Sequence, residues 1–156
     1  MAANTSYTLF QDGLIHGMIA DASPLNEIRS WAAEAAIAFG IAVKRGTNGE
    51  TQVLPGAATL AGVLGISVRD VAREYALRGD TTTSYAIGTQ VSVMRRGYVA
   101  LKCATAGNPA GANRIIVATG VVDMGAPAGG DFASTANLEL QNVIGAGGVG
   151  IFRVTF

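Results

Sequence analysis

The stretch 87–103 constrains the fold more than any other part of the chain. Its residues alternate between apolar and polar character over 91–94 and again over 98–103, as in strands that are buried on one face. The tripeptide Arg-Arg-Gly at 95–97 separates the two runs with residues typical of turns. We therefore expect a β-hairpin here, at the centre of an antiparallel sheet whose branched apolar face lies on the core.

Short β-like runs recur along the rest of the chain, and Gly or Pro residues separate them. We expect further strands at 37–45, 52–54, 60–68, 115–119, 138–144 and 149–156. Asn48-Gly49 is the strongest signal for a tight hairpin turn, and Gly62 and Gly65 inside a strand mark a bulge or a close backbone approach. Many short strands joined by such turns predict an all-β fold, a β-barrel or a jelly-roll-like β-sandwich of antiparallel strands.

Two segments favour helix and strand about equally. Residues 26–36 are rich in Ala, and together with Leu25 before them they place Ile28 and Ala32 at helical spacing. They nevertheless lead directly into the β-like run at 37–45. Residues 69–78 are ambiguous for the same reason, since their apolar positions also fit a helical face. The sequence therefore leaves the secondary structure of both segments open.

The N-terminal residues 1–24 read as an extended arm before a single β-rich domain at 25–156. The arm is polar, and its apolar residues come in pairs instead of following one helical stripe. A segment of this kind becomes ordered by lying across its own domain or a neighbour, with main-chain hydrogen bonds and side chains in pockets. The residues that we expect to bind a partner are Leu9, Phe10, Leu14, Ile15, Met18 and Ile19.

The composition favours a subunit of an assembly. Charged residues make up 14% of the chain and the formal net charge is +0, and a weakly charged neutral surface tends to associate. Eleven cations matched by eleven anions, with no basic aromatic cluster, argue against nucleic-acid binding. We find no secretory signal and no apolar run of transmembrane length, so we expect no membrane association.

No group of residues predicts catalysis, a metal or a cofactor. His16, the only histidine, lies in the arm, where little would hold a catalytic base in place. Cys103, the only cysteine, is in phase with apolar neighbours and reads as a buried side chain. Residues 145–150 match a dinucleotide-binding glycine pattern, but a strand-like run follows them instead of a helix. Trp31 is an interface anchor or core, with core slightly favoured.

Four short motifs follow one another along nearly the whole chain. They are Gly-Met-Ile-Ala-Asp at 17–21, Ala-Phe-Gly at 38–40, Leu-Gly-Ile at 64–66 and Val-Ser-Val-Met-Arg-Arg-Gly at 91–97. In this order and spacing the chain resembles the capsid cement, or head decoration, proteins of tailed bacteriophages.

The resemblance implies a non-enzymatic β-barrel or β-sandwich protein of the virion. Such a protein would bind the outer surface of an icosahedral head and clamp neighbouring major capsid subunits, after synthesis in the bacterial host cytoplasm. A homotrimer is favoured over a homodimer. The alternatives are a small β-barrel enzyme or ligand-binding protein that uses Cys103 or the 145–150 loop, and a phage tail or fibre component.

Overall fold

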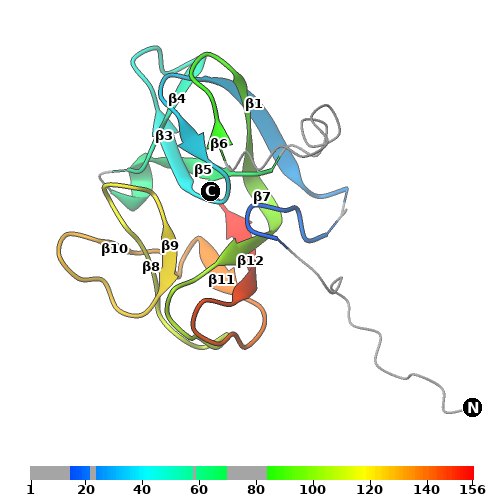
Figure 1. Ribbon diagram of the computed structural model, residues 1–156, viewed down its shortest axis with the longest axis vertical. Helices are drawn as coiled ribbons and strands as arrows, with labels where there is room; N and C mark the ends of the chain where they lie inside the picture. Colours follow the sequence, from blue (N-terminus) through cyan, green and yellow to red (C-terminus); the bar gives the residue numbers. More distant parts are fainter. Residues whose placement is uncertain (1–14, 22–23, 58, 70–83) are drawn as a thin grey trace, which may run out of the picture.

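The computed structural model confirms the predicted all-β fold (Figure 1). It describes residues 15–21, 24–57, 59–69 and 84–156. The elements in chain order are β1 (Glu27–Ala33), β2 (Ile37–Ala38), β3 (Ala42–Arg45), β4 (Gln52–Pro55), the 3-10 turn η1 (Leu60–Gly62), β5 (Val63–Ser67), β6 (Ser84–Tyr85), β7 (Gln90–Lys102), β8 (Asn113–Ile115), β9 (Val122–Met124), β10 (Phe132–Ala133), β11 (Leu138–Leu140) and β12 (Val149–Thr155). Among these residues no helix is long and apolar enough to cross a membrane.

Five strands close into a barrel. They follow one another in the order β1, β4, β3, β5 and β7, and the barrel closes because β1 also pairs with β7. The barrel core includes Trp31, so the interpretation of this residue as core is confirmed. Phe39 and Tyr85 meet edge to face in the same core, with ring centroids 5.0 Å apart.

A second core lies outside the barrel, below it in Figure 1. The later part of β7 pairs with β12, which pairs with β11, and a separate sheet of order β10-β8-β9 supplies further side chains to the same core. Residues from these strands that are buried together include Val99, Leu101, Cys103, Ile115, Val122, Met124, Leu138, Phe152 and Val154. The domain is thus a barrel with a sandwich-like layer attached to it.

The predicted hairpin at 87–103 is wrong, because β7 is one continuous strand of 13 residues. Glu27 of β1 pairs with Arg96 of β7 while the next residue, Ile28, pairs with Met94, so Arg95 is an extra residue in the ladder. The turn-like tripeptide therefore forms a β-bulge, which increases the local twist and bend of the strand without ending it. Gly97 beside it has a φ of 138°, a backbone conformation that favours glycine.

The bulge changes which residues of the strand point into each core. Before it, Val91 and Val93 lie in the barrel core and Met94, on the opposite face, lies in the second core; after it, Val99 and Leu101 lie in the second core. Because successive side chains alternate between the two faces of a strand, one extra residue reverses the alternation. The prediction that each run shares an apolar face is confirmed, but the two runs lie end to end instead of side by side.

Residues 26–36 resolve as strand over Glu27–Ala33, and pairing with β7 decides between the two alternatives. The predicted strand at 37–45 is interrupted, because Gly40 turns the chain with a φ of 70° between β2 and β3. A hairpin does join β3 to β4. Its connection spans 46–51, however, and Gly49 does not adopt the left-handed conformation that a tight turn needs.

The strand predictions near the C-terminus shift in their bounds. The run at 115–119 is wrong as a strand, since β8 ends at Ile115 and residues 117–119 form a turn. The strand at 138–144 stops at Leu140. The final strand is confirmed as β12, in which Phe152 and Val154 are buried and Arg153 and Thr155 are exposed, although Ile151, which alternation places on the side of Arg153, is buried as well. Of the ambiguous segment 69–78, all but its first residue lies outside the described residues.

Candidate functional site

The last part of the predicted arm, residues 15–21, lies along β7 of its own domain, on the edge opposite β12. Ile19 forms an antiparallel bridge with Val99. The main-chain hydrogen bonds that hold this segment join Gly17 N–H to Ala100 O (2.7 Å), Ala100 N–H to Met18 O (2.8 Å) and Ala20 N–H to Tyr98 O (2.9 Å). We call residues 15–21 the arm root, because they fix the point from which residues 1–14 depart.

His16 fastens the arm root through its side chain. Its Nδ1 accepts a hydrogen bond from the main-chain N–H of Lys102 at 2.9 Å. The ring also covers Gly40 so closely that a Cβ built there would lie 2.4 Å from its Cε1 atom. Burial lowers the pKa of His16 from 6.5, the charges of Lys102 and Arg69 lower it further, and a hydrogen bond with the backbone of Phe39 opposes the shift. The neutral imidazole is therefore the form that holds the arm root.

The six residues predicted to bind a partner divide into two groups. Leu9, Phe10 and Leu14 lie outside the described residues. Of the other three, Ile15 is 44% exposed, Met18 is partly buried, and Ile19 packs against the second core of its own domain. Among the described arm residues, Ile15 thus presents the largest apolar surface to a partner.

Four other large apolar side chains are exposed, and none of them belongs to the six residues predicted to bind a partner. They are Leu25, Ile28, Ile87 and Val143, with exposed fractions of 77%, 37%, 70% and 75%. Val143 follows β11 in a loop and Ile87 lies in the turn before β7, so each sits at the end of an element. No sequence pattern separates such residues from buried ones, since both occur in β-like runs of similar character.

The residues of the enzyme alternative do not form a reactive site. Cys103 is fully buried, as predicted, and its Sγ lies 3.9 Å from the carbonyl oxygen of Val122. Burial, together with the nearby charge of Asp123, raises the pKa of this thiol to about 12, so the nucleophilic thiolate is scarce near neutral pH. Residues 145–148 form the turn that leads into β12, and residues 149–150 are the first residues of that strand. The described residues contain no group of three or more His, Cys, Asp or Glu that could hold a metal ion.

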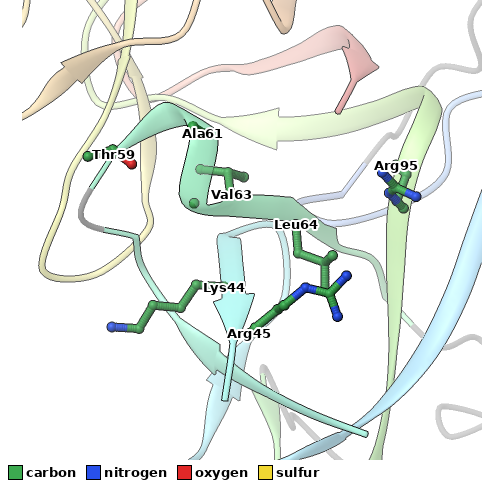
Figure 2. A pocket seen from close by; sticks show the side chains of 8 residues that line it. Lys44, Arg45, Thr59, Ala61, Val63, Leu64 and Arg95 are labelled. Atoms are coloured by element: carbon green, nitrogen blue, oxygen red, sulfur yellow. The ribbon is translucent and has the colours of Figure 1, made fainter. Parts of the chain in front are cut away.

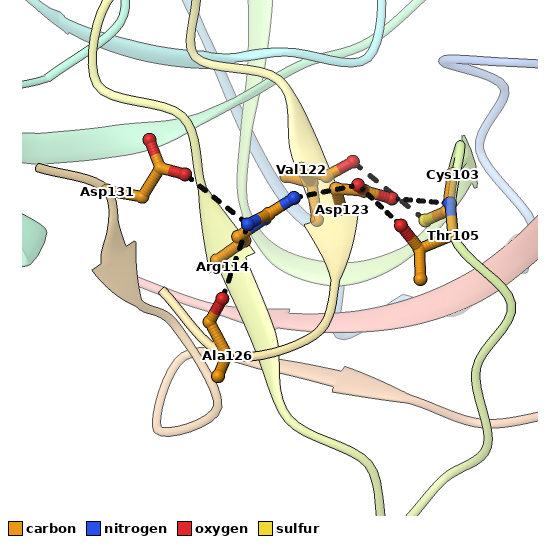
Figure 3. Close-up of polar contacts among 7 residues, drawn as sticks. All are labelled: Cys103, Thr105, Arg114, Val122, Asp123, Ala126 and Asp131. Atoms are coloured by element: carbon orange, nitrogen blue, oxygen red, sulfur yellow. Dashed lines mark hydrogen bonds and ion pairs between the residues drawn. The ribbon is translucent and has the colours of Figure 1, made fainter. Parts of the chain in front are cut away.

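Asp123 on β9 is the centre of a polar cluster (Figure 3). Its carboxylate accepts hydrogen bonds from the N–H and hydroxyl of Thr105 at 2.9 and 3.0 Å, and Arg114 lies between it and Asp131 at 3.4 and 3.7 Å. Burial opposes ionisation of Asp123, but hydrogen bonds from Thr105, Arg114 and the backbone of Met124 outweigh it and hold its pKa below the usual 3.8. The cluster ties the loop after β7 to the β8–β9 hairpin, which is a structural role.

Comparison with known proteins assigns the chain to a family of phage structural proteins. The family model described as "Structural cement protein (E217 gp24/Pam3 gp6)" matches residues 3–155, nearly the whole chain. The protein belongs to this family and is a structural protein of the phage capsid, of the cement or decoration type. The family expected from the four short motifs is therefore confirmed.

A solved structure shows the same fold. A chain from "The capsid of Myoviridae Phage XM1" superposes with a TM-score of 0.66 at 20% sequence identity, over 99% of this chain and 98% of that chain. At this identity the likeness concerns the fold. No curated protein sequence matches the chain. Membership of the cement family implies a non-enzymatic role, association with the major capsid protein and a place in the virion.

Proposed function

We propose that this cement protein binds the outer surface of an icosahedral phage head and clamps neighbouring major capsid subunits. In this proposal the β-rich domain sits on the shell, and the N-terminal arm reaches over an adjacent subunit. The observation that carries the proposal is the fastened arm root, in which main-chain bonds to β7 and the His16 contact fix the departure point of the arm. A fixed root makes a tether effective, because tension on the arm is transmitted directly to the domain.

The length of the arm suits a contact with a neighbouring subunit. Residues 1–14 precede the arm root, and a chain of this length spans at most about 50 Å when fully extended. Leu9, Phe10 and Leu14 supply the apolar side chains in this part. Their burial on a capsid subunit would contribute roughly 25 cal/mol per Å², and any strand addition would contribute main-chain hydrogen bonds.

Repetition on the capsid turns weak contacts into stable attachment. Each protomer of a homotrimer, which we favour over a homodimer, would engage its own patch of the shell. Once one protomer is bound, the others bind at a high effective concentration, so overall affinity exceeds that of one contact. A weakly charged chain with a formal net charge of +0 suits such close packing of copies.

The test compares decoration of purified cement-free heads by the full chain and by a variant that lacks residues 1–14. We expect the truncated protein to lose decoration in a co-sedimentation assay while its thermal unfolding midpoint changes little, since the deletion leaves the arm root in place. A full-length variant with Leu9→Ser and Phe10→Ser should behave in the same way. Asn4→Ser with Thr5→Ser is the matched control and should decorate normally. Full decoration by the truncated protein would refute the role of the arm.

A further inference from the structure

A groove on the barrel is lined by three cations in a chain that has few charges, and Lys44 points away from Arg45 and Arg95 (Figure 2). It lies between β3, the η1–β5 segment and β7, and its volume is about 470 Å³. The residues that line it are Lys44, Arg45, Thr59, Ala61, Gly62, Val63, Leu64 and Arg95. Three of these are cationic and none is acidic. The groove is therefore locally positive although the whole chain has a formal net charge of +0.

The cations of the groove retain unused binding capacity. Lys44 and Arg45 form no ion pair with any residue in the described part of the chain, and Arg45 donates to the main-chain oxygen of Gly49. Arg95 contacts the carboxylate of Glu27 at 3.4 Å and donates to the main-chain oxygen of Phe156 at 3.5 Å, so it is already engaged within the domain. Lys44 and Arg45 are therefore the groove cations that lack an ion-pair partner among the described residues.

The groove continues into an apolar hollow. A second depression of about 460 Å³ is lined by Leu60, Ala61, Val63, Asn137 and Phe156, and it shares Ala61 and Val63 with the first. The shared wall makes the two depressions neighbours along one surface, and Phe156 of the second lies beside Arg95 of the first, whose side chain donates to its main-chain oxygen at 3.5 Å. A segment that carries a carboxylate near an apolar side chain would match the cations of the first depression and the apolar lining of the second.

We propose that this groove receives an acidic segment of a neighbouring major capsid subunit. Carboxylates of that segment pair with the groove cations Lys44, Arg45 and Arg95, and an adjacent apolar side chain lies against Leu60 and Phe156. The proposal rests on the proposed function, because it takes the capsid subunit as the partner. It gives the domain a contact of its own, separate from the arm. Charge complementarity at this contact sets the orientation and the association rate of the domain on the shell.

A pair of single charge reversals tests the groove. Lys44→Glu changes a groove cation, whereas Arg96→Glu makes the same charge change at an exposed arginine that does not line the groove. Neither residue forms an ion pair with a described residue, so the two variants are matched. We expect Lys44→Glu to weaken binding to cement-free heads about tenfold at low salt, and Arg96→Glu to change it less than threefold. Lys44→Arg keeps the positive charge and should bind heads with the affinity of the unmodified protein.

The salt dependence provides a second readout. Binding of the unmodified protein should weaken as salt rises, and the affinity of Lys44→Glu should depend less on salt because one charge contact is lost. Equal affinities of the unmodified protein and Lys44→Glu would overturn the groove proposal and leave the arm untouched. Unchanged head binding with lost affinity for a short DNA duplex would assign the groove to nucleic acid and overturn it as well. Failure of the unmodified protein to bind heads would instead overturn the proposed function.

Discussion

The two halves of β7 are supported in different ways. The half before the bulge lies between β1 and β5, inside a barrel that the domain closes with its own strands. The half after it pairs with β12 on one edge and with the arm root on the other. The barrel half is thus complete without the arm, whereas the outer half uses residues 15–21 as its last strand. The arm root belongs to the fold, and in our proposal residues 1–14 are the part of the arm that reaches a partner.

The largest effect on stability should come from the barrel half. A Cβ at Gly65 of β5 would lie 2.4 Å from the carbonyl oxygen of Met94 and 2.8 Å from the Cγ1 of Val93. Both neighbours belong to β7, so Gly65→Ala forces the two strands apart. We expect the free energy of unfolding to fall by about 3 kcal/mol, as measured by urea denaturation.

The control for this experiment is Gly145→Ala, since nothing lies within 4 Å of a Cβ at Gly145. It should change the free energy of unfolding by less than about 0.5 kcal/mol. Trp31 fluorescence reports on the barrel core, and far-UV circular dichroism reports on all strands. Coincident transitions are expected of a single domain, and two separate transitions would mean that the barrel and the outer layer unfold independently.

A smaller effect should come from the arm root. Ile19 packs against the second core and bridges Val99, so Ile19→Ala should lower the free energy of unfolding by about 1 kcal/mol. Amide hydrogen exchange should then rise at Ala100, whose N–H donates to Met18, and stay unchanged at Val91 in the barrel half. If amide hydrogen exchange rose equally at Ala100 and Val91, the two halves of β7 would not differ in their dependence on the arm root.

The smallest effect should be a pH dependence that His16 confers. Because its pKa is lowered on folding, the neutral imidazole is the favoured folded form. Its contribution to stability is fully present above the unfolded value of 6.5 and is lost as the pH falls through the lower folded value. Lys102 and Arg69 are the charged groups that act on the ring.

The variant His16→Asn isolates this contribution, since the amide oxygen can accept the hydrogen bond of Lys102 and does not titrate. The difference in unfolding free energy between the two proteins should change below pH 6.5 and stay constant above it. Exchange of the Lys102 amide should accelerate over the same range only when His16 is present. A difference that is flat across this range would show that His16 does not fasten the arm root.

The sequence predicted the fold class and the apolar faces, but not the connections between strands. Alternation identified the two runs in β7 because the side-chain period of a strand is independent of its partners. Arg-Arg-Gly at 95–97 was misread because the same residues suit a turn and a bulge, and only pairing with Glu27 and Ile28 decides between them. Residues 26–36 were undecided for a similar reason, since tertiary pairing overrides the helix propensity of an Ala-rich segment.

The candidate binding surfaces were predictable to different degrees. Paired apolar residues in a polar segment identified the arm, although nothing in the sequence indicated that Ile19 would pack on its own domain. The cationic groove was missed because Lys44 and Arg45 lie on β3 and Arg95 lies on β7, far apart in the sequence. These residues come to line one groove only when β3, β5 and β7 pair. Local patterns cannot reveal a surface that is assembled from distant strands.

An electron-microscopy map of heads decorated with the full chain would show whether the arm joins neighbouring capsid subunits. We expect density for residues 1–14 to continue from Ile15 across the boundary between two neighbouring major capsid subunits. We also expect the second of these subunits to hold apolar side chains of the arm, including Leu9 and Phe10. Density for residues 1–14 that folds back onto its own domain, with each copy in contact with a single capsid subunit, would contradict the proposed clamping.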